Sequence, residues 1–416
     1  MTSIYSILAA FAIILIDLFA RAGLDKVLAL TGGPDTVALW AQLQSVVELV
    51  SSVAGAGVLS GLTVMIAQAR DPRDERKLLH DALRLGLGAS LAVGLTAPVL
   101  AAWFTHGKIG PHLFLLAALT GLLAIVPATL NAYWLGKHQQ PRMLVLALLT
   151  GTVLLLVAAG AWLGLPLSGL LLVQCGALLA LGSVIWRHLR KLSRVSRDGG
   201  DDSFRGLAKF VPVGLAIGIM SPVSMLLVRG TLSDALSWSD VGFLQALWRS
   251  AEWVTATAAG VLSLVFLPRF SAAFGTAQFG REMTRAGMIV LSAAACLLLL
   301  IFFNQRALLA TLYDARFAVS DETAALILLG CWVRIASWVF LFGLFAAHRT
   351  WLIVAGEAFS LPLYALLLWL SADGMTTERA AWLFLASYLV YAGFNVAALW
   401  YSLRNPAIAP QGANIE

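Results

Sequence analysis

Long apolar segments alternate with short polar connections along the whole chain. Most of these segments hold about 20 or more residues, the length that an α-helix needs to cross a hydrocarbon core about 30 Å thick. Apolar and polar residues do not alternate in ten-residue segments, so the pattern disfavours an outer-membrane barrel. We therefore predict an all-α integral membrane protein with about twelve transmembrane helices. The expected spans are 3–29, 37–67, 79–104, 112–136, 143–164, 166–188, 207–230, 240–268, 284–304, 321–347, 350–371 and 380–402.

The composition agrees with this class, because 60% of the 416 residues are hydrophobic and only 12% are charged. The most polar stretch, 187–206, lies almost at the midpoint and indicates a linker between two halves. A solvated cytoplasmic loop fits its charge run better than a site for anionic headgroups does. We predict an N-terminal six-helix lobe at 1–188, a basic cytoplasmic linker at 189–206, a C-terminal six-helix lobe at 207–403 and a short cytoplasmic tail at 404–416.

Lysine and arginine gather on alternate connections between the spans. The connections after the even-numbered spans hold eighteen of these residues and the other connections hold seven. This excess predicts that both termini lie in the cytoplasm. The N-terminus lacks the basic region of a cleaved signal peptide, so we expect the first span to be retained.

A sequence repeat relates the second span to the eighth. The stretches 40–60 and 243–263 share a glutamine and the five-residue sequence AGVLS at a constant offset of 203 residues. A weaker echo links His138, after the fourth span, with His348, after the tenth. Each half holds an even number of spans, so we expect parallel repeats related by a pseudo-two-fold axis along the membrane normal, with a binding site between them.

Charged side chains lie inside several of the spans. Gln245, Arg249 and Glu252 share one face of the eighth span by their helical spacing. A charge near the bilayer centre costs roughly 2.5–3.5 kcal/mol on insertion scales, so these groups should face protein or water. An interhelical ion pair that fixes packing explains any one such charge. The number of charges favours a polar cavity, and the other members of the set are Asp17, Arg21, Gln42, Glu48, Arg334 and Glu357.

The residue types in the spans indicate which ligands the protein can bind. Arginine stays ionised and its planar fork suits phosphate oxygens, so Arg249 and Arg334 are the anion-binding candidates. The histidines and cysteines show no metal-ligand spacing, and we expect neither a metal nor a cofactor. The chain carries none of the Walker, HExxH or GxSxG motifs, and we assign no catalytic residue.

The sequence resembles the Wzx-type polysaccharide flippases of the multidrug/oligosaccharidyl-lipid/polysaccharide exporter (MOP) superfamily, and most closely the lipid III flippases of enterobacterial common antigen synthesis. Chain length and the twelve-span layout agree over essentially the full length. Asp17 stands where the family pattern has a basic residue, so no pyrophosphate contact is carried over to the first span. The matching residues are Ala54, Gly55, Ala56, Gly57 and Gly61, then Ser237, Trp238, Val241, Gly242 and Gln245, and finally Leu267, Pro268, Arg269 and Ser271.

The resemblance implies a flippase that moves an undecaprenyl-diphosphate-linked oligosaccharide, such as lipid III or an O-antigen unit, from the cytoplasmic to the periplasmic leaflet of the bacterial inner membrane by alternating access. The expected partners are this lipid-linked glycan, the bilayer and possible polymerase or synthase proteins of the same pathway, and no nucleic acid. Arg249 and Arg334 would bind the headgroup. In the same central cavity we place Gln245, Glu252, Gln42 and Glu48, and we assign possible coupling or gating to Asp17, Arg21 and Glu357.

Two other functions stay open. A cation-coupled multidrug antiporter of the same superfamily would use the same carboxylates, although buried arginines disfavour a cationic substrate. A membrane-embedded glycan polymerase or acyltransferase would need a catalytic constellation, commonly on a sizeable loop, and the outer connections here run only to about 16 residues.

Overall fold

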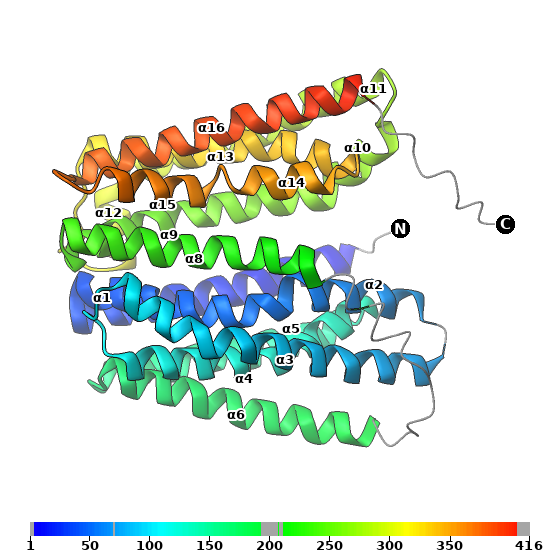
Figure 1. Cartoon of the computed structure of the whole chain (residues 1–416), viewed down its shortest axis with the longest axis horizontal. Helices are drawn as coiled ribbons and strands as arrows, with labels where there is room; N and C mark the ends of the chain where they lie inside the picture. Colours follow the sequence, from blue (N-terminus) through cyan, green and yellow to red (C-terminus); the bar gives the residue numbers. More distant parts are fainter. Residues whose placement is uncertain (1–3, 70, 193–206, 208–210, 406–416) are drawn as a thin grey trace. The chain divides into compact units, whose positions relative to one another are not determined.

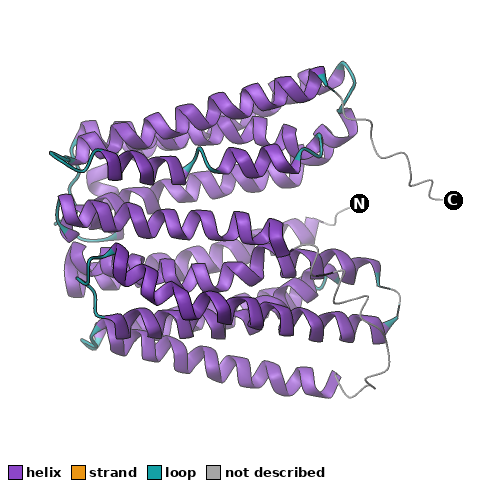
Figure 2. Cartoon of the chain, viewed as in Figure 1, coloured by secondary structure: helices purple, strands orange, loops and turns teal. Residues whose placement is uncertain are grey.

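A computed structural model describes residues 4–69, 71–192, 207 and 211–405. These residues form helices and loops only, as Figure 2 shows. They divide into two compact units: unit 1 comprises Met1–Gly242 with Ala310–Arg316, and unit 2 comprises Phe243–Leu309 with Phe317–Glu416. The predicted all-α class is confirmed.

The helices are labelled in Figure 1. Those of unit 1 are α1 (Ile4–Ala54), the π-helical turn η1 (Gly55–Leu59), α2 (Ser60–Gln68), α3 (Pro72–Phe104), α4 (Pro111–Gly136), α5 (Gln140–Trp162), α6 (Leu167–Leu192) and α8 (Val211–Ala235). Those that lie mainly in unit 2 are α9 (Trp238–Val261), the π-helical turn η2 (Leu262–Phe266), α10 (Leu267–Ala273), α11 (Gln278–Phe303), α12 (Gln305–Leu312), α13 (Asp321–Ala346), α14 (Thr350–Glu357), α15 (Leu361–Leu370) and α16 (Thr377–Arg404).

The number of membrane crossings follows from these bounds. Nine helical segments of the described chain are each long and apolar enough to cross a membrane, with α9–α10 and α14–α15 each counted as one. The bent pair formed by α1 and α2 gives a tenth candidate span. Helix α8 is a further helix of 25 residues. The described chain thus contains nine or more apolar spans, as expected for a helical membrane protein.

Gly33 divides α1 into two helical parts. Its φ of 74° and ψ of −169° fall in a region that is essentially reserved for glycine, and Pro34 follows it. The second part runs back beside the first in Figure 1. This turn explains how a 51-residue helix, which would be about 75 Å long if straight, fits a bilayer.

A segment from the α12–α13 connection packs on this turn within unit 1. Arg316 donates a hydrogen bond to the carbonyl oxygen of Ala29 (2.9 Å), and Lys26 donates one to the carbonyl of Ala310 (3.2 Å). Arg316 also bonds Asp314 (2.9 Å), and its hydrogen bonds hold the pKa of that carboxyl below its ordinary value. The two cations therefore tie residues 310–316 to the end of the first helical part.

Both halves of the predicted repeat carry a π-helical turn near the AGVLS sequence, although at the offset of 203 residues η2 begins four residues later than η1. η1 and η2 each overlap one copy of the AGVLS sequence, in the second and eighth spans. A π-turn is an uncommon local structure, so its presence at both copies supports the relation between the spans.

The weaker echo also has a structural counterpart. His138 and His348 both end a helix with a positive φ, of 52° and 54°. The residue after each histidine donates its amide to the carbonyl five residues earlier, at 2.9 Å for Gln139 and 3.1 Å for Arg349. The α4–α5 and α13–α14 connections are thus built on the same helix-ending motif.

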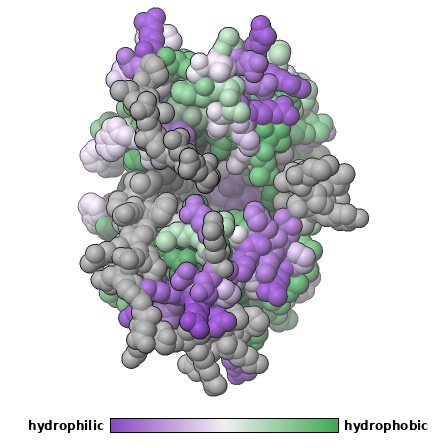
Figure 3. All heavy atoms as spheres, turned by 90° about the vertical axis from the view of Figure 1, so that its right-hand side faces the viewer, coloured by the Kyte–Doolittle hydropathy of each residue, from purple (hydrophilic) through white to green (hydrophobic). Residues whose placement is uncertain are grey.

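Charged residues gather at one end of the helices of unit 1, which faces the viewer in Figure 3. This end carries the α2–α3 and α4–α5 connections, with Arg73 and Arg142. Lys137 places its ammonium 2.7 Å from both carboxylate oxygens of the buried Glu75, and Tyr133 donates to the same carboxylate (3.2 Å). These bonds join α3 to α4 at the charged end.

In unit 2, α13 and α16 lie side by side (Figure 1). Gly330 permits this close approach, because a Cβ at that position would lie 2.6 Å from the Phe384 ring. Both helices are buried along the shared face, and α16 contributes Tyr388, Tyr391 and Asn395 to it.

The predicted bounds of the two lobes, the linker and the tail stay a prediction. α6 continues to Leu192, so the proposed linker at 189–206 begins inside this helix, and residues 193–206 lie outside the described residues. The proposed tail at 404–416 lies outside them from residue 406 onward. α8, which the sequence assigns to the C-terminal lobe, packs with unit 1.

Candidate functional site

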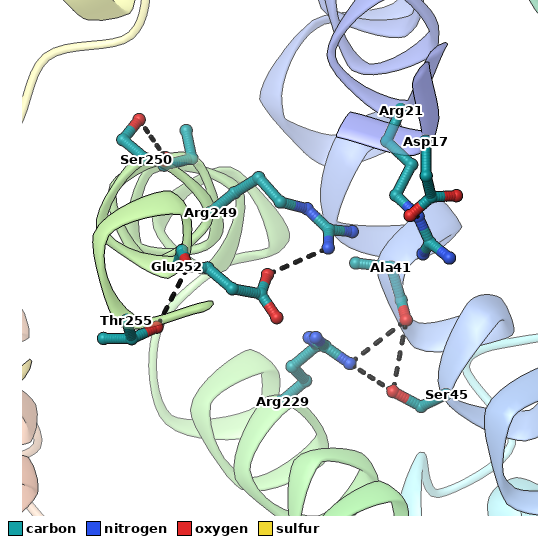
Figure 4. A network of polar contacts seen from close by, with 10 residues as sticks. Asp17, Arg21, Ala41, Ser45, Arg229, Arg249, Ser250, Glu252 and Thr255 are labelled. Atoms are coloured by element: carbon teal, nitrogen blue, oxygen red, sulfur yellow. Dashed lines mark hydrogen bonds and ion pairs between the residues drawn. The ribbon is translucent and has the colours of Figure 1, made fainter. Parts of the chain in front are cut away.

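The pair that the sequence placed on one face of the eighth span forms within unit 2. Arg249 donates to Glu252 on α9 at 3.0 Å, as Figure 4 shows. The arginine side chain is 21% exposed and the glutamate side chain 56%, so an incoming anion has access to the pair. Gln245 lies one turn earlier on the same helix and is buried.

Arg334 lies on α13 among aromatic rings. Its guanidinium carbon is 4.7 Å from the ring centroid of Trp338 and 5.7 Å from that of Tyr388, within the range of cation–π attraction. Among the described residues, no hydrogen bond or ion pair satisfies this guanidinium. The ring faces stabilise the charge but leave the planar fork of N–H donors available.

The aromatic cluster beside Arg334 has unused donors as well. Trp248 packs on Tyr364 and Phe384, with ring centroids 6.3 and 5.9 Å apart. The indole nitrogen of Trp248 and the hydroxyl of Tyr364 are buried, and neither has a hydrogen-bond partner in the described part of the chain. Aromatic faces with polar edges suit a ligand that is both polar and ring-shaped.

Glu357 ends α14 at a break in the eleventh span. Tyr391 donates its hydroxyl proton to the Glu357 carboxylate at 2.8 Å, and the Ser360 hydroxyl lies 3.3 Å from the other carboxylate oxygen. Tyr391 and Ser360 are buried, and Glu357 is partly buried. Glu357 therefore contacts protein within unit 2, and its expected role in coupling or gating stays a prediction.

The structure places a further arginine, Arg229, in the interior of unit 1. It lies on α8, is 6% exposed, and donates to the carbonyl of Ala41 (3.1 Å) and to the hydroxyl of Ser45 (2.5 Å), as Figure 4 shows. Gln42, one residue along, is buried and donates to the carbonyl of Leu226 on α8 (3.1 Å). Polar contacts therefore join α8 to the second part of α1.

The sequence interpretation missed the position of Arg229. Arg229 lies at the end of the span expected at 207–230 and was counted with the charges of the connection that follows it, whereas α8 continues to Ala235. A helical projection of residues 226–233 would have placed Arg229 on the face of the buried Leu226, Ser233 and Leu232 neighbours.

The remaining predicted residues do not join these clusters. Asp17 and Arg21 pair with each other at 2.9 Å along α1, and both are exposed (Figure 4). The Glu48 side chain is exposed, and its carboxylate forms no hydrogen bond or ion pair with any described residue. Glu48 thus lies on the same helical part as Gln42 but on a different face.

Comparison with solved structures shows which fold the chain shares. The chain superposes on an inward-facing MATE family transporter of the MOP superfamily with a TM-score of 0.70 and 12% sequence identity, covering 95% of this chain and 96% of that one. The chain therefore has the same fold as that transporter.

Sequence comparison is more specific. The chain is 25% identical over 407 residues to the lipid III flippase of Escherichia coli (strain K12) and, with the same figures, to that of Shigella flexneri, covering 93% of this chain and 96% of each relative. No family model matches the chain. The predicted resemblance to lipid-linked oligosaccharide flippases and the predicted fold of about twelve helices in two lobes are confirmed by these comparisons.

Proposed function

We propose that the protein is a flippase that moves an undecaprenyl-diphosphate-linked oligosaccharide from the cytoplasmic to the periplasmic leaflet of the bacterial inner membrane by alternating access. The full-length similarity to two proteins named lipid III flippase supports this substrate class. The transporter fold supports movement of substrate without covalent change.

The observation that carries the proposal is the state of Arg334. A partly buried guanidinium that makes no hydrogen bond or ion pair with the described residues is costly inside a membrane span, and a ligand anion lowers that cost. The pyrophosphate of the substrate supplies such an anion, and the arginine fork matches its oxygen geometry.

The neighbouring groups extend the site for the same substrate. The pair of Arg249 and Glu252 is accessible, so a phosphate oxygen can replace the carboxylate as the partner of Arg249. The unused hydroxyl and indole donors of Tyr364 and Trp248 suit sugar oxygens, and their ring faces suit the apolar faces of sugar rings. Gln245, on the same helix as Arg249, is a candidate for sugar contacts, and the binding roles expected of Gln42 and Glu48 in unit 1 stay predictions.

The membrane topology belongs to the same proposal. The excess of lysine and arginine on alternate connections supports a topology with both termini in the cytoplasm, where lipid-linked sugars are assembled on the inner leaflet. We expect the polymerases or synthases of the same glycan pathway to be its functional partners, and we expect no catalytic residue in the chain.

A cation-coupled multidrug antiporter is the principal rival, since it has the same fold. The charge of the site distinguishes the two functions. Arg334 and Arg249 repel an organic cation, whereas a drug antiporter needs carboxylates that are free of arginine partners.

Complementation in Escherichia coli lacking its own lipid III flippase tests the proposal. We expect the wild-type chain to restore surface glycan. Arg334→Ala should lower transport at least tenfold, because the loss of a desolvated arginine–phosphate contact costs about 1.5–3 kcal/mol. Arg334→Lys should be intermediate, since it keeps the charge but loses the fork.

Arg306→Ala is the matched control. This arginine is 83% exposed and pairs at 3.6 Å with the exposed Asp321, so its loss should leave transport unchanged. Full transport by Arg334→Ala at normal membrane abundance would overturn the assignment of the anion site.

A further inference from the structure

The exposed face of α3 changes from cationic to apolar along the helix. Arg73, His80 and Arg84 are exposed and share one face by their helical spacing. The same stripe continues through the exposed Leu87 and Leu95. α3 has 33 residues, whereas about 20 cross a hydrocarbon core about 30 Å thick. Because the apolar residues follow Arg84, the cationic part of the stripe extends beyond the core, at the depth of the lipid headgroups.

The acidic residues of the same turns do not neutralise this stripe. Glu75 is buried and accepts its hydrogen bonds from α4. Asp81 is partly buried and has a contact of its own. Asp74 is exposed but lies about 100° around the helix from Arg73. The side chains of Arg73 and Arg84 form no hydrogen bond or ion pair with any described residue, so both guanidinium groups are available to a ligand.

α11, the ninth span, carries the same arrangement in unit 2. Arg281 and Arg285 are exposed on one face at the start of the helix, and the exposed Met288 and Leu299 continue the stripe. Glu282 lies between the two arginines in sequence, but it is partly buried and pairs at 4.0 Å with an arginine of α10. Neither Arg281 nor Arg285 bonds a described residue. The third span of each predicted half therefore begins with outward-facing arginines above an apolar stripe.

We propose that the outward stripes at the starts of α3 and α11 bind the headgroups of anionic phospholipids. A ligand that fits a stripe needs a negative charge beside the arginines and hydrocarbon beside the apolar residues, and an anionic phospholipid has both in one molecule. The planar arginine fork matches phosphate oxygens. A dissolved phosphate ion gains nothing from the apolar part of the stripe, because burial of hydrocarbon supplies that part of the binding.

The position of the stripes also favours a lipid of the surrounding bilayer as the occupant. Each stripe lies on the side of its helix that is opposite the buried residues, as Glu75 and Leu79 show for α3. Bilayer lipids therefore reach the arginines without a conformational change. This inference goes beyond the proposed function and does not depend on it, since no substrate site takes part.

The thermal stability of the purified full-length protein in a nonionic detergent tests the proposal. The midpoint of unfolding is followed while phosphatidylglycerol or, at the same concentration, zwitterionic phosphatidylcholine is added to the micelles. We expect phosphatidylglycerol to raise the wild-type midpoint more, because a ligand that binds only the folded state stabilises it. The difference between the two lipids should shrink as NaCl is raised from about 0.05 to about 0.5 M, since salt screens exposed charges.

Two double variants remove the cations of one stripe each: Arg73→Gln with Arg84→Gln in α3, and Arg281→Gln with Arg285→Gln in α11. Each should reduce the rise that is specific to phosphatidylglycerol by about half, because two independent sites add their stabilisation. The fourfold variant should raise the phosphatidylglycerol concentration required by at least about tenfold, since each arginine near an anionic bilayer surface contributes about fivefold to binding. All four residues are exposed, so the fold itself should be unaffected.

Arg306→Gln is the control, because this exposed arginine lies on α12, outside both stripes, and it should respond as the wild type does. Equal rises with the two phospholipids would overturn the proposal, and so would a fourfold variant that responds as the wild type does. A rise with inorganic phosphate as large as that with phosphatidylglycerol would overturn it in favour of a site for the free ion. A rise with undecaprenyl phosphate but not with phosphatidylglycerol would overturn it in favour of a site for polyprenyl lipids. Phospholipid binding without flipping would remove only the proposed function, and flipping without a lipid preference would remove only this inference.

Discussion

At the scale of single residues, two arginines in the spans differ in how their charge is satisfied. Arg229 gives its donors to a backbone carbonyl and a hydroxyl of a neighbouring helix. Arg334 packs its guanidinium on two aromatic ring faces and donates no hydrogen bond to any described residue. A satisfied charge is expected to stabilise packing and an unsatisfied one to bind a ligand, so the two residues should respond differently to substitution.

We expect Ser45→Ala to destabilise unit 1. The substitution removes an acceptor from the buried Arg229, and an unsatisfied charged donor costs about 1–3 kcal/mol. The free energy of unfolding, measured in mixed detergent micelles, should fall by this amount. Ser183→Ala removes an exposed serine that bonds only within its own helix and should have little effect. Equal stability of the two variants would show that the Arg229 contact is dispensable.

At the scale of elements, three kinds of irregularity interrupt the membrane helices. Gly33 lets the chain reverse between the first two spans, the π-turns η1 and η2 mark the repeated spans, and the break at 358–360 exposes the end of α14. Each irregularity lies beside a sequence feature that was visible from the start: a glycine followed by proline, the AGVLS repeat, and Pro362.

Gly33→Ala should destabilise the α1 turn. A side chain at φ 74° and ψ −169° costs about 1–3 kcal/mol, and its Cβ would lie 3.2 Å from the Arg316 guanidinium. Gly23→Ala is the matched control on the same helix, where no atom lies within 4 Å of the added Cβ. It should be neutral or stabilising by up to about 1 kcal/mol, because alanine favours helix more than glycine does. Thermal unfolding of the two variants compares them, and an unchanged midpoint for Gly33→Ala would contradict the role of the turn.

At the scale of the whole molecule, the sequence predicts the fold class because each membrane crossing requires an apolar run of about 20 residues, and such runs are easily recognised. The predictions of membrane-spanning helices, of the repeat of the second and eighth spans and of the family resemblance all come from patterns of apolar residues and short identities. Boundaries were less well predicted where polar residues continue a helix, as at Leu192 and Ala235.

The site was predicted in part. Helical spacing was sufficient to pair Arg249 with Glu252 and Asp17 with Arg21, because these contacts are local. The contacts of Arg334 with Tyr388 and of Glu357 with Tyr391 join different helices, and no spacing in one sequence encodes them. Contacts between helices also explain why the buried position of Arg229 was missed. For the same reason, Glu48 was grouped with residues that it does not contact.

The central claim is that this chain moves an undecaprenyl-diphosphate-linked oligosaccharide across a bilayer with Arg334 as an anion-binding residue. The most direct measurement uses the purified chain in proteoliposomes that contain such a lipid with a fluorophore on its glycan. A membrane-impermeant quencher reports which leaflet holds the label. The account predicts that wild-type protein exposes the inner-leaflet label far faster than protein-free vesicles do, and that Arg334→Ala does not. Exposure by the wild type at the protein-free rate, with the protein folded and correctly inserted, would contradict it.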